Sequence, residues 1–166
     1  MYYKNYYQSP IGKIFLIAED NFLIGLYFEA QKYFPQEIFD QIEKKNLEIF
    51  DVTKKWLDIY FNGYEPDFLP PLKMIGTDFQ IEVWKLLLKI PYGKITTYGE
   101  LSKVIADQRN LQRFSAQAIG DAVGKNKISI IIPCHRVIGS DGSLTGYAGG
   151  IDKKSRLLNL EKCLID

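Results

Sequence analysis

The chain has 166 residues, of which 46% are hydrophobic and 25% are charged, and this composition is typical of a globular protein with one large or two small cores. No apolar run reaches the roughly 20 residues that a membrane-spanning helix needs. Residues 1–6 lack the apolar segment of a secretory signal, so we expect a cytoplasmic protein. Two Cys and one His argue against a metal site, and a reducing compartment predicts free thiols.

The net charge of +1 is unevenly distributed along the chain. Residues 1–75 carry 8 Lys and Arg against 11 Asp and Glu, whereas residues 76–166 carry 13 against 9. A positive C-terminal half fits a surface that faces nucleic acid. A merely solvated surface is the commoner cause of an imbalance of this size.

Two strands are expected near the N-terminus, at residues 13–18 and 23–28. Both segments are rich in β-branched and aromatic residues, and the turn formers Asp20 and Asn21 lie between them. Residues 9–12, Ser-Pro-Ile-Gly, predict an earlier turn. The first part of the chain therefore predicts a small sheet.

A helix is expected after these strands, followed by a linker. Apolar residues recur there at helical spacing, and Gly63 follows as a stop signal; the apolar positions are Val52, Trp56, Ile59 and Tyr60. Residues 65–71 contain three prolines and predict a linker. We therefore expect two domains, a small α+β domain with its linker at residues 1–75 and a second domain at residues 76–166.

The second domain begins with two helices that carry capping signals. Thr77 is followed three residues later by Gln80, which predicts a capping box, and this helix is expected to end at Pro91. Thr97 and Glu100 predict a second capping box before a shorter helix. Both helices have an apolar stripe that predicts one buried face.

A third helix is expected after Ser115, which can cap it. One face carries the small residues Ala118 and Ala122, with Gly120 nearby. Close packing against another helix is the commoner reason for such a face. The alternative is the recognition helix of a helix-turn-helix motif pressed against DNA, which Arg109 and Arg113 in the preceding connection favour.

The chemically distinctive segment follows this helix. Residues 128–132 predict a buried strand, and Pro133 is expected to end it immediately before Cys134. His135 is the only histidine of the chain, and an imidazole can lower the pKa of a neighbouring thiol or accept its proton. A buried and unreactive Cys134 is an equally good interpretation of these residues alone.

The wider sequence around Cys134 resembles a known family. Residues 132–139 (Ile-Pro-Cys-His-Arg-Val-Ile-Gly) and 142–150 (Gly-Ser-Leu-Thr-Gly-Tyr-Ala-Gly-Gly) closely resemble the active-site segment of O6-alkylguanine-DNA alkyltransferases, the methylated-DNA–protein-cysteine methyltransferases. Further matches occur in the same order at residues 77–80, 83–84, 90–93, 97–101 and 157–161. The resemblance spans roughly residues 76–162 and is loose before them. It implies an α+β protein with a ribonuclease-H-like N-terminal domain and a mainly helical, winged-helix-like C-terminal domain that contains a helix-turn-helix.

The resemblance implies a single-turnover DNA repair reaction by direct reversal. The alkyl group of O6-alkylguanine, with O4-alkylthymine as a second candidate substrate, passes to Cys134, while Glu161 orients His135 and His135 deprotonates the thiol through a water. Tyr98 matches the residue that gives a proton to the departing base. Because the product is a stable thioether, one molecule repairs one base, and neither a cofactor nor a metal is needed.

The same resemblance implies that a monomer binds double-stranded DNA containing an alkylated guanine, which must leave the base stack. Residues expected to contact the DNA or the base, or to hold the parts that do, are Gln117, Asn126, Arg136, Ser140 and Tyr147. This chain departs from the family pattern at Gln117, where an intercalating Arg is expected, and at Lys127, where a Pro is expected. The segment before Gln117 is also longer than expected, and we hypothesise that Arg113 in it supplies the missing positive charge.

Three other functions compete with this interpretation. A non-enzymatic damage-recognition protein of similar shape would lack the acceptor cysteine, which is present here. A winged-helix transcription regulator would not depend on the thiol. A cysteine hydrolase would need a histidine from elsewhere in the fold, and the only histidine adjoins Cys134.

Overall fold

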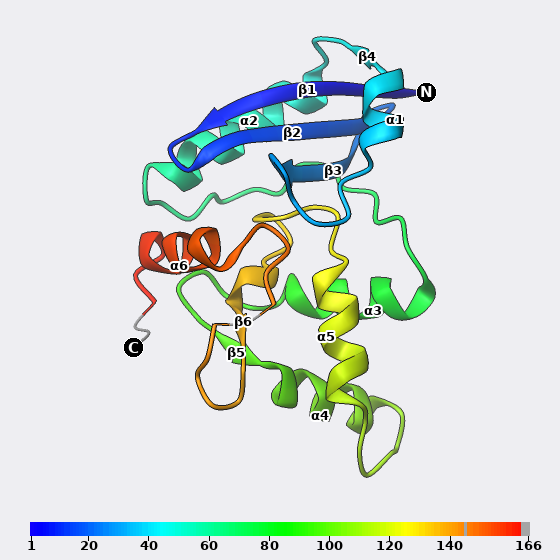
Figure 1. Ribbon diagram of the computed structural model, residues 1–166, viewed down its shortest axis with the longest axis vertical. Coiled ribbons are helices and arrows are strands. Elements are labelled where there is room, and N and C mark those ends of the chain that lie inside the picture. Colours follow the sequence, from blue (N-terminus) through cyan, green and yellow to red (C-terminus); the bar gives the residue numbers. More distant parts are fainter. Residues whose placement is uncertain (145, 164–166) are drawn as a thin grey trace. The chain divides into compact units, whose positions relative to one another are not determined.

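The computed structural model describes residues 1–144 and 146–163, which form two compact units (Figure 1). The N-terminal unit contains residues 1–75 together with the short segment Lys127–Ile131. The C-terminal unit contains residues 76–126 and the chain from Ile132 onwards. None of the helices within the described ranges is both long enough and apolar enough to cross a membrane.

A four-stranded sheet forms the centre of the N-terminal unit. Its strands are β1 (Tyr2–Ser9), β2 (Gly12–Glu19), β3 (Phe22–Phe28) and β4 (Glu43–Lys44), in the order β3-β2-β1-β4. The first three strands are antiparallel neighbours, and β4 runs parallel to β1. The two expected strands and the turn before them are confirmed. The sequence did not predict β1, because polar residues occur on both of its faces and hide the alternation that marks a strand.

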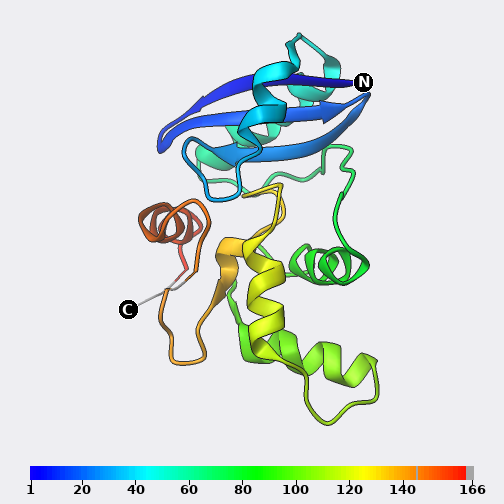
Figure 2. The same cartoon turned by 45° about the vertical axis from the view of Figure 1, so that its right-hand side comes forward.

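Two helices cover opposite faces of this sheet (Figure 2). They are α1 (Gln36–Gln41) and α2 (Glu48–Phe61). Successive side chains of a strand point to opposite faces, so Tyr6 and Tyr7 of β1 contact different helices. The Tyr6 ring lies 5.7 Å from that of Phe39 on α1, and the Tyr7 ring stacks on Phe61 of α2 at 6.2 Å. The helix expected around Trp56 is therefore confirmed as α2.

Two distant segments of the chain cover the free edge of β3. Leu23 forms a bridge with Leu72 after the linker, and Leu26 forms one with Ile128. The prediction of a strand at residues 128–132 is wrong, because the chain turns after this bridge and Ile130 has a φ of +71°. The left-handed region is strained for a β-branched residue. The apolar run is buried as expected, but a short apolar run does not distinguish a strand from a buried turn.

The C-terminal unit is mainly helical, and with the N-terminal sheet it confirms the expected α+β fold. Its elements are α3 (Asp78–Leu87), β5 (Thr96–Thr97), α4 (Tyr98–Gln108), α5 (Ala116–Gly124), a 3₁₀ turn at Cys134–Arg136, β6 (Val137–Ile138) and α6 (Ile151–Leu160). The strands β5 and β6 form a small parallel pair. Helix α5 packs against both α3 and α4, and the indole Nε1 of the buried Trp84 donates a 2.9 Å hydrogen bond to the carbonyl of Ala122. Ala122 thus serves helix packing, while Gln117 at the start of α5 is exposed.

The expected caps begin all three helices. The hydroxyl of Thr77 accepts from the backbone N–H of Gln80, whose side chain accepts from the backbone N–H of Thr77, so the first capping box is complete. Thr97 and Ser115 cap α4 and α5. The Glu100 carboxylate accepts from the hydroxyl of Thr97 rather than from its backbone, so the second box is half formed.

Candidate active site

The cysteine singled out in the sequence begins a tight turn inside the C-terminal unit. Pro133 precedes it, and the backbone N–H of Cys134 donates to the carbonyl of Ile132 at 2.8 Å. Cys134 and the two residues after it form a single 3₁₀ turn, and all three are buried. The thiol therefore lies at the start of a turn that leads into β6, not at the end of a strand.

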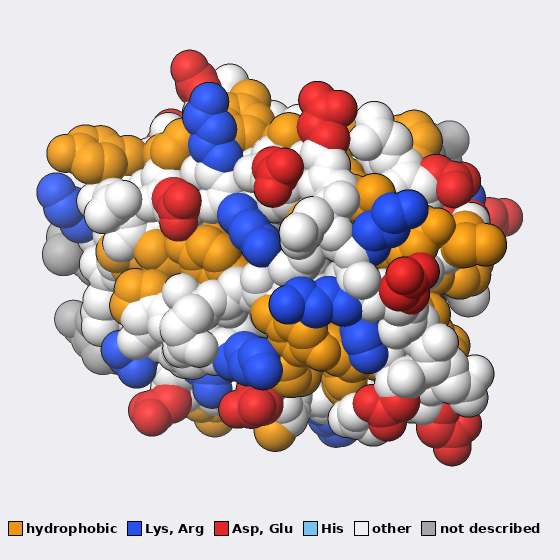
Figure 3. Space-filling view, turned by 90° about the horizontal axis from the view of Figure 1, so that it is seen from above, with side chains coloured by type: hydrophobic (Ala, Val, Ile, Leu, Met, Phe, Trp, Pro, Cys, Tyr) orange, Lys and Arg blue, Asp and Glu red, His pale blue; other side chains and the backbone are white. Residues whose placement is uncertain are grey.

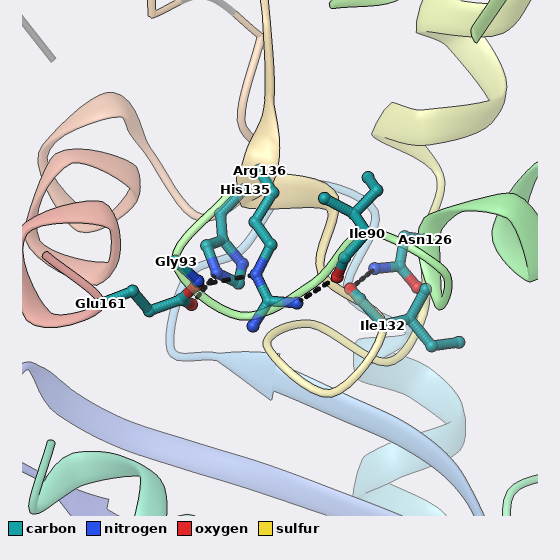
Figure 4. A network of polar contacts seen from close by, with 7 residues as sticks. All are labelled: Ile90, Gly93, Asn126, Ile132, His135, Arg136 and Glu161. Atoms are coloured by element: carbon teal, nitrogen blue, oxygen red, sulfur yellow. Dashed lines mark hydrogen bonds and ion pairs between the residues drawn. The ribbon is translucent and has the colours of Figure 1, made fainter. Parts of the chain in front are cut away.

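The carboxylate of Glu161 is the centre of a buried polar network (Figure 4). One oxygen accepts from Nε2 of His135 at 2.5 Å, and the other accepts from Nε of Arg136 at 2.8 Å and from the backbone N–H of Gly93 at 3.1 Å. Gly93 has a φ of +79°, a backbone conformation that only glycine adopts without strain. Arg136 also donates from Nη1 to the carbonyl of Ile90 at 2.7 Å. The network joins the loop after α3, the cysteine turn and the end of α6.

Electrostatics fix the protonation state of this network. Burial opposes ionisation of Glu161, but its hydrogen bonds to His135 and Arg136 outweigh burial and hold its pKa at about 2. Burial, together with the charges of Arg136 and Lys154, lowers the pKa of His135 although Glu161 raises it, so the imidazole is neutral at neutral pH. Its proton then lies on Nε2, where Glu161 accepts it. Nδ1 is left as a buried acceptor that has no hydrogen-bond partner among the described residues.

Opposing effects act on the pKa of the Cys134 thiol. Burial raises its pKa, whereas a hydrogen bond from Asn126 and the charge of Lys154 lower it. Because burial is the largest effect, the resting group is a thiol and not a free thiolate. The site thus combines a protonated cysteine with a neutral and buried imidazole base.

Lys154 is a functional candidate that the sequence reasoning missed. Its side chain is fully buried on α6, and Nζ donates to the carbonyl of Val137 in β6 at 2.5 Å. Burial lowers its pKa to about 8. The sequence did contain a signal, since Lys154 precedes the buried Leu157 and Leu158 by three and four residues and so lies on the buried face of the helix.

Tyr98 and Asn126 flank the cysteine. Tyr98 begins α4, and burial and the proximity of Cys134 raise the pKa of its phenol. Its ring packs against Gly120 of α5, where an added Cβ would meet the ring at 3.8 Å. Asn126 follows α5, and its Nδ2 donates to the carbonyl of Ile132 at 2.8 Å. The start of α4 and the end of α5 are thereby fixed close to the thiol.

Models of two protein domains match almost the entire chain. The 6-O-methylguanine DNA methyltransferase ribonuclease-like domain matches residues 1–74, and the DNA-binding domain of the same family matches residues 78–163. The chain belongs to the 6-O-methylguanine DNA methyltransferase family. The resemblance found around Cys134 is therefore confirmed.

Relatives within this methyltransferase family align over nearly their whole length. The methylated-DNA–protein-cysteine methyltransferase of Methanosarcina barkeri is 44% identical over 162 residues, which is 98% of either chain. That of Haemophilus influenzae is 39% identical and covers 96% of this chain and 86% of its own. The crystal structure of Mycobacterium tuberculosis O6-methylguanine methyltransferase has a TM-score of 0.83 at 42% identity, covering 98% and 93% of the two chains. The M. tuberculosis OGT has also been crystallised in complex with DNA, with a TM-score of 0.82 at 40% identity, covering 96% and 92%.

The residues expected at the DNA of this methyltransferase occupy two kinds of environment. Arg113, Gln117 and Ser140 are exposed, whereas Tyr147 is buried. Arg136 is also buried, and its guanidinium is held by Glu161 and the carbonyl of Ile90. This placement favours a positioning role inside the protein over the DNA contact expected from the sequence.

Proposed function

We propose that the chain repairs DNA by direct reversal, moving the alkyl group from O6 of guanine to the sulfur of Cys134. The observation that carries the proposal is the position of His135. Glu161 holds its Nε2 at 2.5 Å, and its Nδ1 is a buried acceptor with no hydrogen-bond partner among the described residues, in the residue next to Cys134. The lowered pKa of the ring fits a neutral base. A base of this kind suits a thiol that must ionise only when substrate is present.

The first step is removal of the thiol proton. A water between Cys134 and Nδ1 of His135 passes this proton to the imidazole, and the nearby Glu161 carboxylate stabilises the resulting imidazolium. The positive charge of Lys154 and the Asn126 amide stabilise the thiolate as it forms. This arrangement offsets the burial that otherwise raises the pKa of Cys134.

The second step is a displacement at the alkyl carbon. A sulfur lone pair forms the new S–C bond while the C–O6 bond breaks, and its electrons pass into the guanine ring. Tyr98 donates a proton to the departing base, and the proton that left the thiol restores the phenol. The products are guanine and a neutral thioether, so the transfer needs no cofactor.

Access of the base to the sulfur is restricted, because Cys134 is only 6% exposed. O6 of guanine faces its pairing partner in a duplex, so the nucleotide must leave the stack before it can enter such a site. In this proposal Tyr147 lies beside the base that has left the stack. The exposed Gln117 at the start of α5 contacts the DNA, and Ser140 contacts a phosphate. We expect O4-alkylthymine to be a weaker substrate, to be tested in the same assay.

Arg113 supplies the positive charge that Gln117 lacks. It lies in the loop between α4 and α5, which Arg109 anchors through a 2.7 Å ion pair with Glu82 and by lying over the ring of Phe114 at 5.1 Å. An anchored loop presents an exposed Arg113 at low entropic cost. Arg113→Ala is expected to slow duplex repair more than Lys55→Ala, its control on α2, at low and moderate salt. Equal rates for the two variants would refute this role.

The direct test is the mass of the protein after reaction. The chain is incubated with excess O6-methylguanine duplex, its intact mass is measured, and the modified peptide is mapped. We expect one methyl group on Cys134, none on Cys163, and none on the Cys134→Ser variant. Binding without a gain in mass would support a damage-recognition protein instead, and many turnovers per molecule would support a hydrolase.

The reaction also sets expectations for the state of the protein. It needs a reduced thiol, which fits a cytoplasmic location, where both cysteines stay free. One acceptor serves one lesion, so a monomer is sufficient. Light scattering with and without duplex tests this state, and an obligate dimer would contradict it.

A further inference from the structure

The N-terminal unit carries a cluster of lysines that the proposed reaction does not use. Figure 3 shows Lys and Arg side chains gathered over hydrophobic side chains on the face seen from above. Three lysines of β1, β2 and β4 lie over aromatic rings on the face of the sheet that contacts α1, and we call them the lysine surface: Lys4, Lys13 and Lys44. This cluster is notable because residues 1–75 are acidic as a whole.

Two of these lysines converge on one ring. The ammonium group of Lys13 lies 4.4 Å from the centre of the Tyr6 ring, and that of Lys44 lies 5.7 Å from the same centre. Lys13 also lies 5.7 Å from the ring of Phe15. Ring faces attract cations, so the aromatic cluster holds the two positive charges close together.

The third lysine extends the surface. Nζ of Lys4 lies 4.6 Å from the centre of the Phe39 ring and donates to the carbonyl of Phe39 at 2.7 Å. Lys45 lies 4.8 Å from the ring of Tyr3, which strand alternation places on the opposite face, so it is not part of the lysine surface. All three ammonium groups of the surface are therefore positioned by the protein.

No ion pair of the described residues balances the positive charge of this surface. Lys4 and Lys44 are register partners on β1 and β4, so two like charges stand side by side on one face, which is destabilising. None of the ion pairs found in residues 1–144 and 146–163 includes any of the three lysines. Glu43 precedes Lys44 on β4, and strand alternation directs it to the opposite face. A bound polyanion would remove this repulsion.

We propose that the lysine surface binds the phosphodiester backbone of double-stranded DNA, as a contact separate from the helix-turn-helix. The inference rests on the proposed function for the identity of the polyanion. Because the lysines cover the faces of Tyr6 and Phe39, bases cannot stack there as they do in single-strand binding sites. The contact therefore recognises the charge of the phosphates and not the base sequence.

The test is the salt dependence of binding to an undamaged duplex by the full chain. The variant is Lys13→Gln and Lys44→Gln combined, and the control removes the same charge from the exposed Lys55 and Lys85. Each lost phosphate contact reduces the slope of log K against log salt by about 0.9. We expect a reduction of about 2 for the lysine-surface variant, equal for two duplexes of unrelated sequence, and of less than about 1 for the control.

Further arms separate the alternative outcomes. A variant that replaces the same two lysines with Arg keeps the charge and the ring contacts, so it should keep the wild-type slope and shows that the positions tolerate substitution. An unchanged slope in the Gln variant overturns the proposal. If that variant also aggregates, the lysines only protect the edge of the sheet from pairing with other chains. Methylation of Cys134 is measured on the same samples. A reduced slope without methylation of Cys134 would support DNA binding by the lysine surface and would contradict the proposed reaction.

Discussion

Glu161 accepts a 2.5 Å hydrogen bond from His135 although the two side chains are completely buried. An ionised carboxylate in such a place is stable only when hydrogen bonds and a counter-charge surround it, and Arg136 and the backbone of Gly93 supply these. The hydrogen bond from His135 to Glu161 also places the imidazole proton on Nε2. The stability of this buried network therefore depends on one carboxylate, and so does the readiness of His135 in the proposed reaction.

Glu161→Gln is expected to reduce both stability and transfer rate. The amide leaves the buried Arg136 without its counter-charge, which costs about 3–5 kcal/mol of unfolding free energy. Methyl transfer should slow by about 10²–10⁴-fold because His135 loses its orienting partner. Urea unfolding and single-turnover transfer measure the two effects.

A double variant separates the two roles of this carboxylate. Adding Arg136→Met to Glu161→Gln removes the unpaired charge, so most of the lost stability should return while transfer remains slow. Recovery of the transfer rate together with stability would show that Glu161 acts only through the fold.

Acid should weaken the wild-type protein through the same group. The folded pKa of Glu161, about 2, lies below its ordinary value of 4.5, so its contribution to stability is complete above pH 4.5 and is lost as the pH falls toward 2. The difference in unfolding free energy between wild type and Glu161→Gln should shrink over this window. A difference that stays constant between pH 5 and pH 3 would contradict the assignment.

Lys154 should shape the response to alkaline pH. Its charge favours the thiolate, and its pKa of about 8 means that this help is lost above pH 8. We expect the plot of transfer rate against pH to rise as the thiol ionises and to become less steep near pH 8. The Lys154→Met variant should be slower at pH 7, and its plot should show no change of slope near pH 8. The same change of slope in the pH–rate plot of the variant would show that another group causes it.

Lys154 also gives a stability test with a defined sign. Because its folded pKa lies below the ordinary 10.5, the unfolded chain binds more protons between pH 8 and 10.5, and the unfolding free energy contributed by this group rises across that window. The rise should be missing from Lys154→Met when the two proteins are compared by urea unfolding.

Gly120 is predicted to tolerate alanine but not a large residue. A Cβ there meets the Tyr98 ring at 3.8 Å, an ordinary contact, and alanine favours a helix over glycine by about 1 kcal/mol. Gly120→Ala should thus keep its transfer rate and gain stability, whereas Gly120→Leu should displace Tyr98 and slow transfer. Thermal unfolding and transfer assays on both variants are needed, and a fast Gly120→Leu would argue against the role of Tyr98.

Thr77→Ala serves as a variant that affects stability alone. It removes the capping box of α3 and should cost about 1 kcal/mol. Transfer at saturating duplex should not change, because Thr77 is exposed and belongs to no part of the network around Glu161. A slower transfer would reveal a coupling between α3 and the site.

Local signals in the sequence were sufficient to predict much of the fold and to single out Cys134 as a candidate, whereas its role as the acceptor came from the family resemblance. Thr77, Thr97 and Ser115 marked helix starts because capping is a short-range interaction between a side chain and its own backbone. Cys134 and His135 adjoin in sequence, so their association needed no fold. Glu161 came from family resemblance, since nothing in its surroundings marks a carboxylate that reaches residues 25 and 26 positions away.

What the sequence did not show was decided by tertiary structure. The family resemblance implied that Arg136 contacts DNA, which stays a prediction, and only the fold shows that Glu161 and the carbonyl of Ile90 hold its guanidinium. Lys154 was overlooked because a lysine is normally solvated. The turn at Ile130 was assigned to a strand because periodicity does not reveal a positive φ.

The detour of the chain through Lys127–Ile131 bears on attempts to divide the protein. This segment belongs to the core of the N-terminal unit, yet it lies between Asn126 and the turn that begins at Cys134. A fragment that begins at residue 76 would keep Cys134 but would carry residues 127–131 without the strand that Ile128 pairs with, so Ile128, Ile130 and Ile131 would lose burial. Such a fragment should aggregate, and the position of its Cys134 thiol should be less well defined. The two halves are therefore better expressed as one polypeptide.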